Sequence, residues 1–330
     1  MIPAQSGSML LGRHQEPFHL NMALQEDPQR SPKIEGYFKN LVRTGFSGAM
    51  LVAHKGEIIY KNAHGLKSGI SRDSLTTQSS FQLASVSKQF TAAAIMKLKE
   101  WGVINYSDKV AKHIPEFPYP KVTIRQLLVH RSGLSEYTYF MEKQQHEANT
   151  FIDNDDVLDY MAKHKPDPYY QAGRAFNYRN TNYMLLASIV EHVTNMRFPE
   201  FMKVQFFQPL NMHHSFVFTG NKDYQRPYIT RGHHYKWRVY DKHYQDGVYG
   251  DKGIYASVED LFKWDRALHT NKILQQSTLR KAFKPGSPNR HFKNYGFGWR
   301  MREDSSGETF YYHPGWWHGY KTLYVRIPKT

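Results

Sequence analysis

The hydrophobic pattern changes its period along the chain, and this change predicts where strands and helices lie. Residues 46–53 and 57–63 are apolar runs joined by a His-Lys link and a glycine, which favours a β-hairpin. Three more β-like runs, separated by turns, occupy residues 295–301, 309–313 and 321–327. Between the two strand regions, helical periodicity dominates. The helical segments are expected at 84–96, 123–130, 154–164, 183–195, 199–205, 258–269 and 277–283, with a further one at 34–42 before the hairpin.

Strands near both ends and helices between them predict an α+β protein. We expect an antiparallel sheet built from residues 34–84 and 286–330, with residues 85–285 as a large, mostly helical insertion. Together these form one expected domain, 34–330. Residues 1–33 show no clear periodicity and are expected to be an extended or poorly ordered leader.

The helix expected at 84–96 is apolar on nearly every side, which is typical of a buried helix. It carries Ser85 and, three residues later, Lys88, so both side chains lie on one face. Burial favours the neutral form of a lysine, and a neutral amine can accept the proton of a serine that attacks a carbonyl. The spacing alone also fits a serine at a helix start and a solvated lysine.

The composition excludes several classes of site. The 330 residues contain no cysteine, so disulfides, thiolate zinc sites and cysteine nucleophiles are excluded. The metalloprotease motif His-Glu-x-x-His and the nucleophile elbow Gly-x-Ser-x-Gly do not occur. We therefore expect no metal ion and no cofactor.

The net charge of +15 fits either a soluble basic surface or attraction to an anionic polymer. The densest basic stretch, 231–238, interleaves cations with aromatic residues, but no nucleic-acid-binding signature accompanies it, so nucleic-acid binding is not expected. No apolar run reaches transmembrane length, and residues 1–7 show neither the basic nor the apolar region of a signal peptide.

Three motifs in chain order resemble the serine β-lactamase and penicillin-binding-protein superfamily, in the branch with class C β-lactamases, D,D-carboxypeptidases, D-aminopeptidases and related esterases. The motifs are Ser85-Val-Ser-Lys88, Tyr178-Arg-Asn180 and His313-Pro-Gly315. In the third, the family has Lys-Thr-Gly or His-x-Gly. Segments 127–134, 250–261 and 295–299 also resemble stretches typical of this branch.

The resemblance implies acyl transfer through a covalent serine intermediate. Lys88 would take the proton of Ser85, and Tyr178 would relay a proton to the leaving group. Asn180 would hydrogen-bond Lys88 and the substrate, and His313 would orient the substrate or share the proton network. Three of these residues could instead have purely structural roles. Tyr178 could be a packed aromatic residue, Asn180 a helix cap and His313 a buried histidine of a strand.

The family geometry assigns the oxyanion hole to the backbone N–H groups of Ser85 and of Trp316, the residue after Gly315. The substrate would be an ester or amide, such as a D-amino-acid peptide, a cell-wall peptide or a small carboxyl ester. Weak β-lactamase activity is expected, because a largely neutral His313 replaces a lysine that would grip a carboxylate. A periplasmic or extracellular location is implied. A non-catalytic peptidoglycan- or peptide-binding member of the same fold is the alternative.

The resemblance also implies one more strand and a helix after residues 321–327, with that strand joining them to residues 46–53. The sequence given stops at Thr330. We therefore expect either a piece of a longer protein or a fold in which residues 8–24 turn back to occupy the missing position. In both cases, strands 46–53 and 321–327 should not pair directly.

Overall fold

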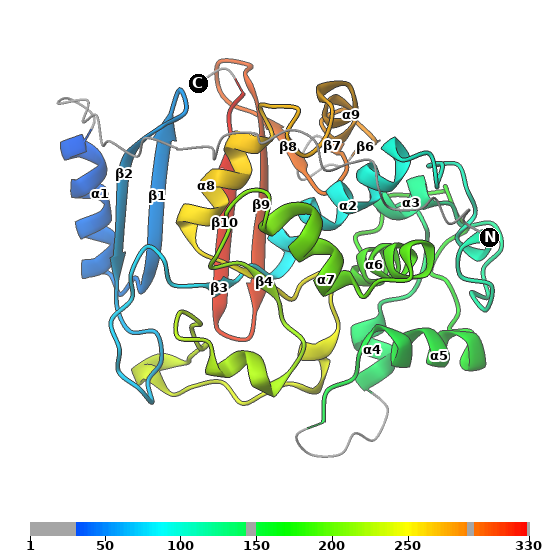
Figure 1. Ribbon diagram of the computed structural model, residues 1–330, viewed down its shortest axis with the longest axis horizontal. Coiled ribbons are helices and arrows are strands. Elements are labelled where there is room, and N and C mark those ends of the chain that lie inside the picture. The colour runs from blue at the N-terminus through cyan, green and yellow to red at the C-terminus, as the bar shows by residue number, and fades with distance from the viewer. Residues whose placement is uncertain (1–30, 143–149, 289–293, 329–330) are drawn as a thin grey trace, which may run out of the picture.

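The structure is a computed structural model, and it describes residues 31–142, 150–288 and 294–328 (Figure 1). Residues 1–30 of the expected leader, 1–33, lie outside the described residues. The expected fold-back of residues 8–24 lies outside them as well, and only the last three residues of the leader are described. Those three open the first helix, α1, which spans Ser31–Arg43.

The secondary structure follows the expected order of strands, helices and strands. The helices are α1, α2 (Lys88–Glu100), α3 (Ile124–Leu128), α4 (Tyr137–Glu142), α5 (Asn154–His164), α6 (Asn180–Thr194), α7 (Phe198–Met202), α8 (Val258–Ala267) and α9 (Gln276–Ala282). The strands are β1 (Gly48–His54), β2 (Glu57–His64), β3 (Phe81–Gln82), β4 (Phe216–Val217), β5 (Ile254–Ala256), β6 (Ser287–Pro288), β7 (Asn294–Tyr295), β8 (Arg300–Glu303), β9 (Thr309–Trp317) and β10 (Tyr320–Arg326).

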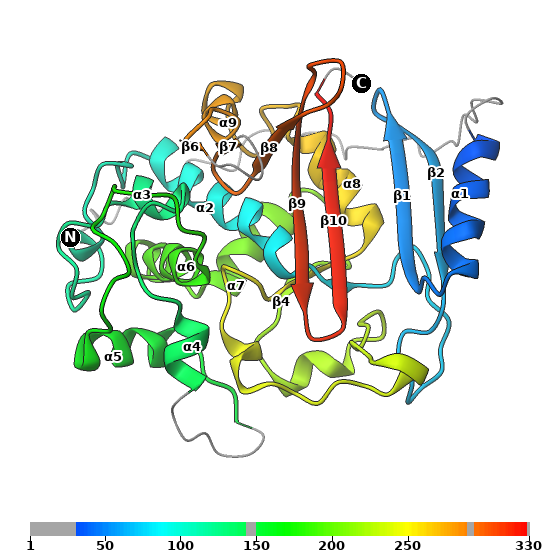
Figure 2. The same cartoon turned by 180° about the vertical axis from the view of Figure 1, so that it is seen from behind.

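The strands form antiparallel sheets, and the expected α+β class is confirmed. Strands β1 and β2 form a hairpin, and the late strands form a five-stranded sheet in the order β10-β9-β8-β7-β6. A small third sheet, β3-β5-β4, lies within the mostly helical part. Strands β1 and β10 lie side by side but belong to different sheets, so the expectation that residues 46–53 and 321–327 do not pair directly is confirmed (Figures 1 and 2).

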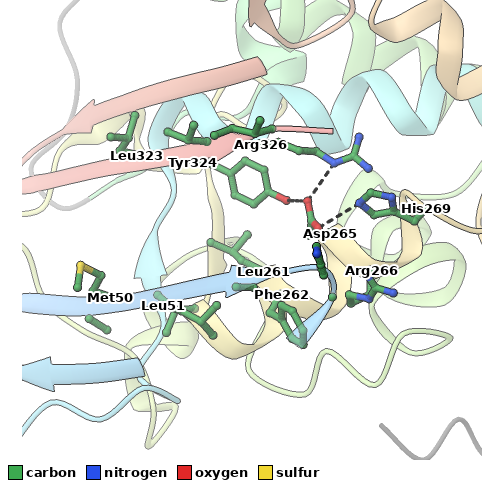
Figure 3. A pocket seen from close by; sticks show the side chains of 17 residues that line it. Met50, Leu51, Leu261, Phe262, Asp265, Arg266, His269, Leu323, Tyr324 and Arg326 are labelled. Carbon is green, nitrogen blue, oxygen red and sulfur yellow. Dashed lines mark hydrogen bonds and ion pairs between the residues drawn. The ribbon is translucent and has the colours of Figure 1, made fainter. Parts of the chain in front are cut away.

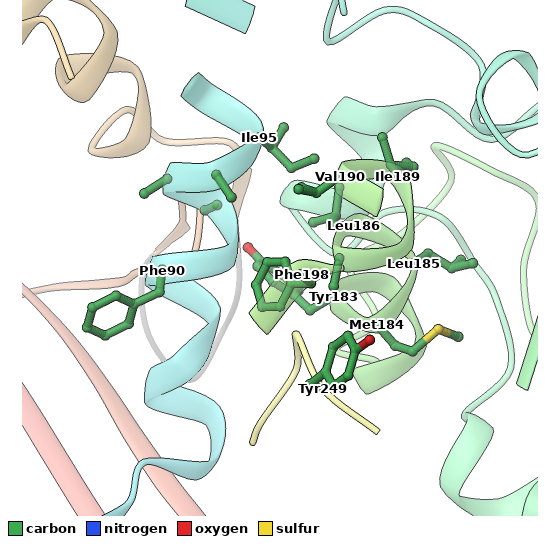
Figure 4. Close-up of a cluster of buried hydrophobic side chains, with 14 of the residues drawn as sticks. Phe90, Ile95, Tyr183, Met184, Leu185, Leu186, Ile189, Val190, Phe198 and Tyr249 are labelled. Carbon is green, nitrogen blue, oxygen red and sulfur yellow. The ribbon is translucent and has the colours of Figure 1, made fainter. Parts of the chain in front are cut away.

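The core is centred on α2, which is buried along almost its whole length. One side of α2 packs against α6, where Tyr183, Leu186 and Val190 are fully buried (Figure 4). On another side, Phe90 stacks on Trp264 of α8 with ring centroids 4.2 Å apart. Truncating a large buried aromatic of this kind costs about 3–5 kcal/mol of unfolding free energy. This packing fixes the start of α2, where Lys88 is the first residue and the turn that carries Ser85 directly precedes it.

In the described part of the chain, no helix combines the length and apolar character that a membrane crossing requires.

Candidate active site

Ser85 lies in a single 3₁₀ turn, Ala84–Ser87, which leads directly into α2. Ala84 has a positive φ of 48°, a left-handed conformation that is costly for a residue with a side chain. The Ala84 N–H donates to Oε1 of Gln82 over 3.0 Å, which helps to hold this turn. Ala84 and Val86 are buried, whereas Ser85 is half-buried. The tight turn therefore presents the Ser85 hydroxyl at the edge of the core, and such backbone strain often accompanies a functional position.

Lys88 is completely buried, and its amine contacts three oxygens. Its Nζ lies 3.0 Å from Ser85 Oγ, 2.8 Å from Asn180 Oδ1 and 2.9 Å from the carbonyl oxygen of Asp251. The amide and the carbonyl oxygens can only accept hydrogen bonds. A neutral amine at this place would give its two hydrogens to these two oxygens, which would leave its lone pair facing the Ser85 hydroxyl. This arrangement is the one that a general base for Ser85 requires.

Tyr178 completes the group around the serine. Its hydroxyl lies 2.9 Å from Ser85 Oγ. The Nζ of Lys88 lies 5.0 Å from the centroid of the Tyr178 ring. The expected convergence of the three side chains is thus present: Lys88 and Tyr178 both reach the same oxygen of Ser85.

Asn180 is the first residue of α6, so its side chain and its backbone N–H act at the helix start. The side chain holds Lys88, as described above, and the N–H donates to Oε2 of Glu136 over 2.9 Å. Burial raises the pKa of the Glu136 carboxyl, and the hydrogen bond from Asn180 opposes that rise. A carboxylate at this position also interacts favourably with the positive end of the α6 dipole.

His313 lies on β9, fully buried beside the site. Its Nδ1 is 2.7 Å from the Pro314 carbonyl oxygen, which can only accept, so Nδ1 carries the hydrogen. Nε2 then accepts from the Tyr295 hydroxyl over 3.1 Å. Burial, with the neighbouring Arg300 guanidinium acting in the same direction, holds the pKa of His313 well below 6.5. The structure therefore places His313 as a neutral imidazole with both nitrogens in protein hydrogen bonds.

Gly315 and Trp316 continue the same strand past the serine turn. A Cβ on Gly315 would collide with the Leu83 carbonyl oxygen and with Thr322 Oγ1, so glycine lets β9 approach the turn closely. The Trp316 side chain is 64% exposed. Gly315 thus brings β9 against the serine turn, and Trp316, the next residue, has its side chain on the surface.

The comparisons with known proteins identify the family of this chain. The sequence model of the family described as Beta-lactamase matches residues 34–330. The chain belongs to the β-lactamase family.

Several members of the family are similar over most of this chain. A penicillin-binding protein of Bacillus subtilis is 33% identical over 302 residues, which are 85% of this chain and 65% of that protein. A D-aminopeptidase of Cereibacter sphaeroides is 26% identical over 266 residues, 78% of this chain and 50% of that protein. The chain thus spans about two thirds or less of the length of these curated relatives.

Solved structures show the same fold. An octameric penicillin-binding protein homologue from Pyrococcus abyssi has a TM-score of 0.79 at 23% identity, over 91% of this chain and 71% of that one. A penicillin-binding protein from Bacillus halodurans has a TM-score of 0.77 at 23% identity, over 89% of this chain and 91% of that one.

Sequence reasoning missed a buried polar cluster behind Lys88 in this β-lactamase-family site. Lys252 Nζ lies 2.5 Å from the Tyr137 hydroxyl and 3.8 Å from Oδ1 of Asp251, and all three residues are buried. Burial lowers the pKa of Lys252. Because the backbone carbonyl of Asp251 accepts from Lys88, this cluster fixes one of the amine's acceptors. The segment 250–261 stood out in the sequence, but nothing in it indicated this contact.

His130 was missed too, and it supports Tyr178. The two rings pack against each other at a tilt of 34°, with centroids 4.3 Å apart, and His130 Nδ1 lies 3.2 Å from the Arg179 backbone nitrogen, which donates to it. Burial is the largest cause that keeps the pKa of His130 well below 6.5. The Arg179 guanidinium itself stacks on Tyr169, with Cζ 4.5 Å from that ring centroid. The described residues contain no group of three or more histidines and carboxylates that could hold a metal ion.

Proposed function

We propose that this β-lactamase-family chain is a serine hydrolase that cleaves an ester or amide through an acyl-enzyme on Ser85. The observation that carries the proposal is the convergence of Lys88 Nζ and Tyr178 Oη on Ser85 Oγ, at 3.0 and 2.9 Å. A base and a second proton carrier within hydrogen-bonding reach of one hydroxyl are what nucleophilic catalysis by serine needs.

Acylation begins when Ser85 Oγ attacks the substrate carbonyl carbon and its proton passes to the lone pair of Lys88. The backbone N–H groups of Ser85 and Trp316 stabilise the oxyanion of the tetrahedral intermediate. The carbon–heteroatom bond then breaks, and Tyr178 gives its proton to the leaving nitrogen or oxygen. The proton that Lys88 took from Ser85 then replaces the one that Tyr178 gave up, so Lys88 and Tyr178 end the step unchanged and the serine proton departs on the leaving group.

Deacylation runs the same chemistry with water as the nucleophile. Tyr178 or Lys88 removes a proton from the water as it attacks the ester carbonyl of the acyl-enzyme, and Ser85 Oγ leaves with a proton from the same network. The products are a carboxylic acid and the regenerated serine.

The substrate is a small ester or a peptide, and a D-amino-acid peptide fits best. Relatives of this chain include proteins named penicillin-binding protein and D-aminopeptidase. The neutral, fully hydrogen-bonded His313 offers no positive charge to a substrate carboxylate, which disfavours β-lactams as substrates.

The test is to incubate the full chain with a fluorophosphonate probe and to measure its intact mass. We expect a single adduct, mapped to Ser85 by peptide analysis, that is absent from Ser85→Ala and present in Ser71→Ala, an exposed serine on a surface turn. Failure of every acylating probe, penicillin included, to label a folded protein would contradict the hydrolase proposal and favour a non-catalytic peptide-binding member.

A further inference from the structure

Two loops meet at one corner of the molecule, and together we call them the two-loop tip. The first loop, residues 65–74, follows β2, and the second, residues 231–242, lies in the segment between β4 and β5. They lie side by side at the lower left of Figure 1 and at the same corner, now lower right, in Figure 2. The backbone N–H of Arg231 donates to the Lys67 carbonyl oxygen over 2.7 Å, which joins the two loops.

Trp237 packs the two loops tightly together. A Cβ on Gly69 would collide with the Trp237 carbonyl oxygen, and a Cβ on Gly65 would lie 2.9 Å from Cη2 of the indole. Only glycine permits so close an approach at these two positions. The tip is therefore one packed unit, in which residues of both loops hold fixed positions relative to each other.

The tip holds the two most exposed large apolar side chains among the described residues. Tyr235 is 87% exposed and Ile70 is 76% exposed. Single exposed apolar residues are common on protein surfaces and need no explanation. Here, however, the two highest values occur on loops that contact each other. Two apolar side chains that project from one corner suit a partner with an apolar phase.

Leu323, another strongly exposed apolar residue, has a different explanation. It lines the hollow between β1 and β10, which Figure 3 shows with Leu51 on the opposite side. The family resemblance implies one more strand at that place, and this strand would cover Leu323. Neither Ile70 nor Tyr235 lines that hollow or its continuation. Such a strand therefore does not account for their exposure.

Cations surround the two apolar side chains. The two loops contain six basic and two acidic residues: Lys67, Arg72, Arg231, Lys236, Arg238 and Lys242, against Asp73 and Asp241. Asp73 pairs with Lys67 over 3.8 Å. Within the described ranges, Arg72, Lys236 and Arg238 are exposed and form no ion pair. The tip thus carries a positive charge that its own carboxylates do not balance.

The second loop presents its exposed residues on a fixed turn. The His234 N–H donates to the Arg238 carbonyl oxygen over 2.7 Å, and Lys236 and Trp237 between them have φ values of 56° and 62°. Two consecutive left-handed residues make the kind of turn that closes a tight hairpin, but they are costly without glycine. Such residues persist only where the surrounding structure fixes them, here through the packing of Trp237. Tyr235 therefore projects from a turn that is already ordered.

We propose that the two-loop tip docks on the surface of an anionic lipid bilayer. Ile70 and Tyr235 enter the interface between head groups and acyl chains. Arg72, Lys236 and Arg238 lie against the lipid phosphates. A bilayer offers an apolar phase next to a layer of negative charge, whereas an acidic polymer offers only the charge. Tyrosine suits this depth because its ring is apolar and its hydroxyl is polar. The docking goes beyond the proposed hydrolase activity and does not depend on it.

The test is co-sedimentation of the full chain with large vesicles of phosphatidylcholine, alone or mixed equally with phosphatidylglycerol. We expect binding to the mixed vesicles only, and weaker binding when salt is raised from about 0.1 M to about 0.5 M. Lys236→Glu combined with Arg238→Glu should weaken binding about 25-fold or more, because each cation near an anionic surface contributes about fivefold.

The matched control is Arg280→Glu combined with Lys281→Glu, which changes the net charge equally. Both residues are exposed on α9, far from the tip (Figure 1). This variant should bind the mixed vesicles much as the wild type does. Circular dichroism checks that both variants keep the fold.

Insertion of the apolar side chains has its own readout. The chain contains no cysteine, so Ile70→Cys labelled with a nitrobenzoxadiazole dye carries a single probe. We expect its emission to rise and shift to the blue on mixed vesicles. The same label on Val103→Cys, at an exposed position in the turn after α2, should not respond.

Several results would overturn the proposal. These are no binding to mixed vesicles, equal binding to both vesicle types, full binding by the Lys236 and Arg238 charge reversal, and an unchanged signal from the label at position 70 on bound vesicles. Binding to soluble polyglutamate as tight as that to mixed vesicles would also overturn it, because an acidic polymer would then suffice.

Discussion

The protonation state of Lys88 is the residue-scale feature on which the proposed chemistry depends. Two of its three contacts are oxygens that can only accept, so in the neutral amine only the lone pair remains for Ser85. In Lys88→Ala, Ser85 therefore loses its base. We expect fluorophosphonate labelling to slow by about 10²- to 10⁴-fold, with the fold retained.

The control is Lys97→Ala on the same helix, where the amine donates to the Ile273 carbonyl oxygen far along α2 from the serine. This variant should label at the wild-type rate. Near wild-type labelling of folded Lys88→Ala would move the base to another residue. Circular dichroism of both variants checks that the fold is intact.

His313 leads to a second residue-scale prediction. We expect measurable hydrolysis of p-nitrophenyl esters and weak or no hydrolysis of nitrocefin, because the neutral imidazole has both nitrogens in protein hydrogen bonds and offers no cation to the β-lactam carboxylate. Steady-state rates on the two chromogenic substrates at pH 8 compare them directly. Efficient nitrocefin turnover at that pH would contradict this role for His313.

At this scale, motif spacing predicted the residues that meet at Ser85 but not those that support them. Ser85 and Lys88 lie in one short segment, so helical periodicity alone places them on one face. Glu136 accepts from the backbone N–H of Asn180, and the backbone carbonyl of Asp251 accepts from Lys88. The His130 ring packs against the ring of Tyr178. Such contacts depend on how distant segments pack, and no local pattern in the sequence encodes them.

At the scale of elements, β9 and the serine turn are held together by a close backbone approach at Gly315. A methyl group there would collide with the Leu83 carbonyl oxygen and with Thr322 Oγ1. Gly315→Ala should therefore push β9 away from the turn, lower the unfolding free energy by about 1–3 kcal/mol and slow labelling of Ser85. Chemical denaturation and probe kinetics measure the two effects.

Gly36 provides the matched control, since a Cβ there meets nothing within 4 Å and the residue lies on an exposed face of α1. Gly36→Ala should keep the labelling rate and leave stability equal or higher, because alanine is the better helix former by about 1 kcal/mol. If Gly315→Ala behaved like Gly36→Ala, the close approach would not matter for the site.

Elements with strong local signals were predicted well, and elements made by tertiary contacts were not. Helix α5 spans the expected 154–164, and α3 begins at the expected cap, where Thr123 and Gln126 form a capping box. Helix α6 begins at Asn180, three residues before the expected 183. The prediction missed these residues because Thr181 and Asn182 are polar, whereas in the structure both are buried and their side chains form hydrogen bonds with residues 132–135.

The expected strand at 295–301 is also different in the structure. It is split into β7 and β8 around Gly298, whose φ is +81°. The two- and three-residue strands β3, β4 and β5 are too short to produce a period-2 signal, so the third sheet could not be foreseen. In each case, pairing between distant segments sets the backbone, and local propensity does not.

At the scale of the whole molecule, two buried histidines make stability depend on pH. The folded-state pKa values of His130 and His313 lie well below 6.5, mainly because of burial. Below about pH 6.5 the unfolded chain binds protons at both positions, whereas the folded chain does not. Stability therefore rises with pH in this range and falls as the pH drops. Glu136, whose pKa is raised by burial, acts in the opposite direction.

We expect the unfolding free energy to fall between pH 7 and pH 5, and we expect His313→Gln to make this fall less steep. Well below pH 6.5, each neutral buried histidine contributes about 1.4 kcal/mol per pH unit to the slope, and the substitution removes the contribution of His313. The slope from urea unfolding at several pH values is the informative quantity, because it is separate from any constant loss of packing. His64→Gln, at an exposed histidine on β2, should keep the wild-type slope. An unchanged slope in His313→Gln would mean that His313 takes up a proton in the folded protein, and the argument that it is neutral beside Lys88 would fail with it.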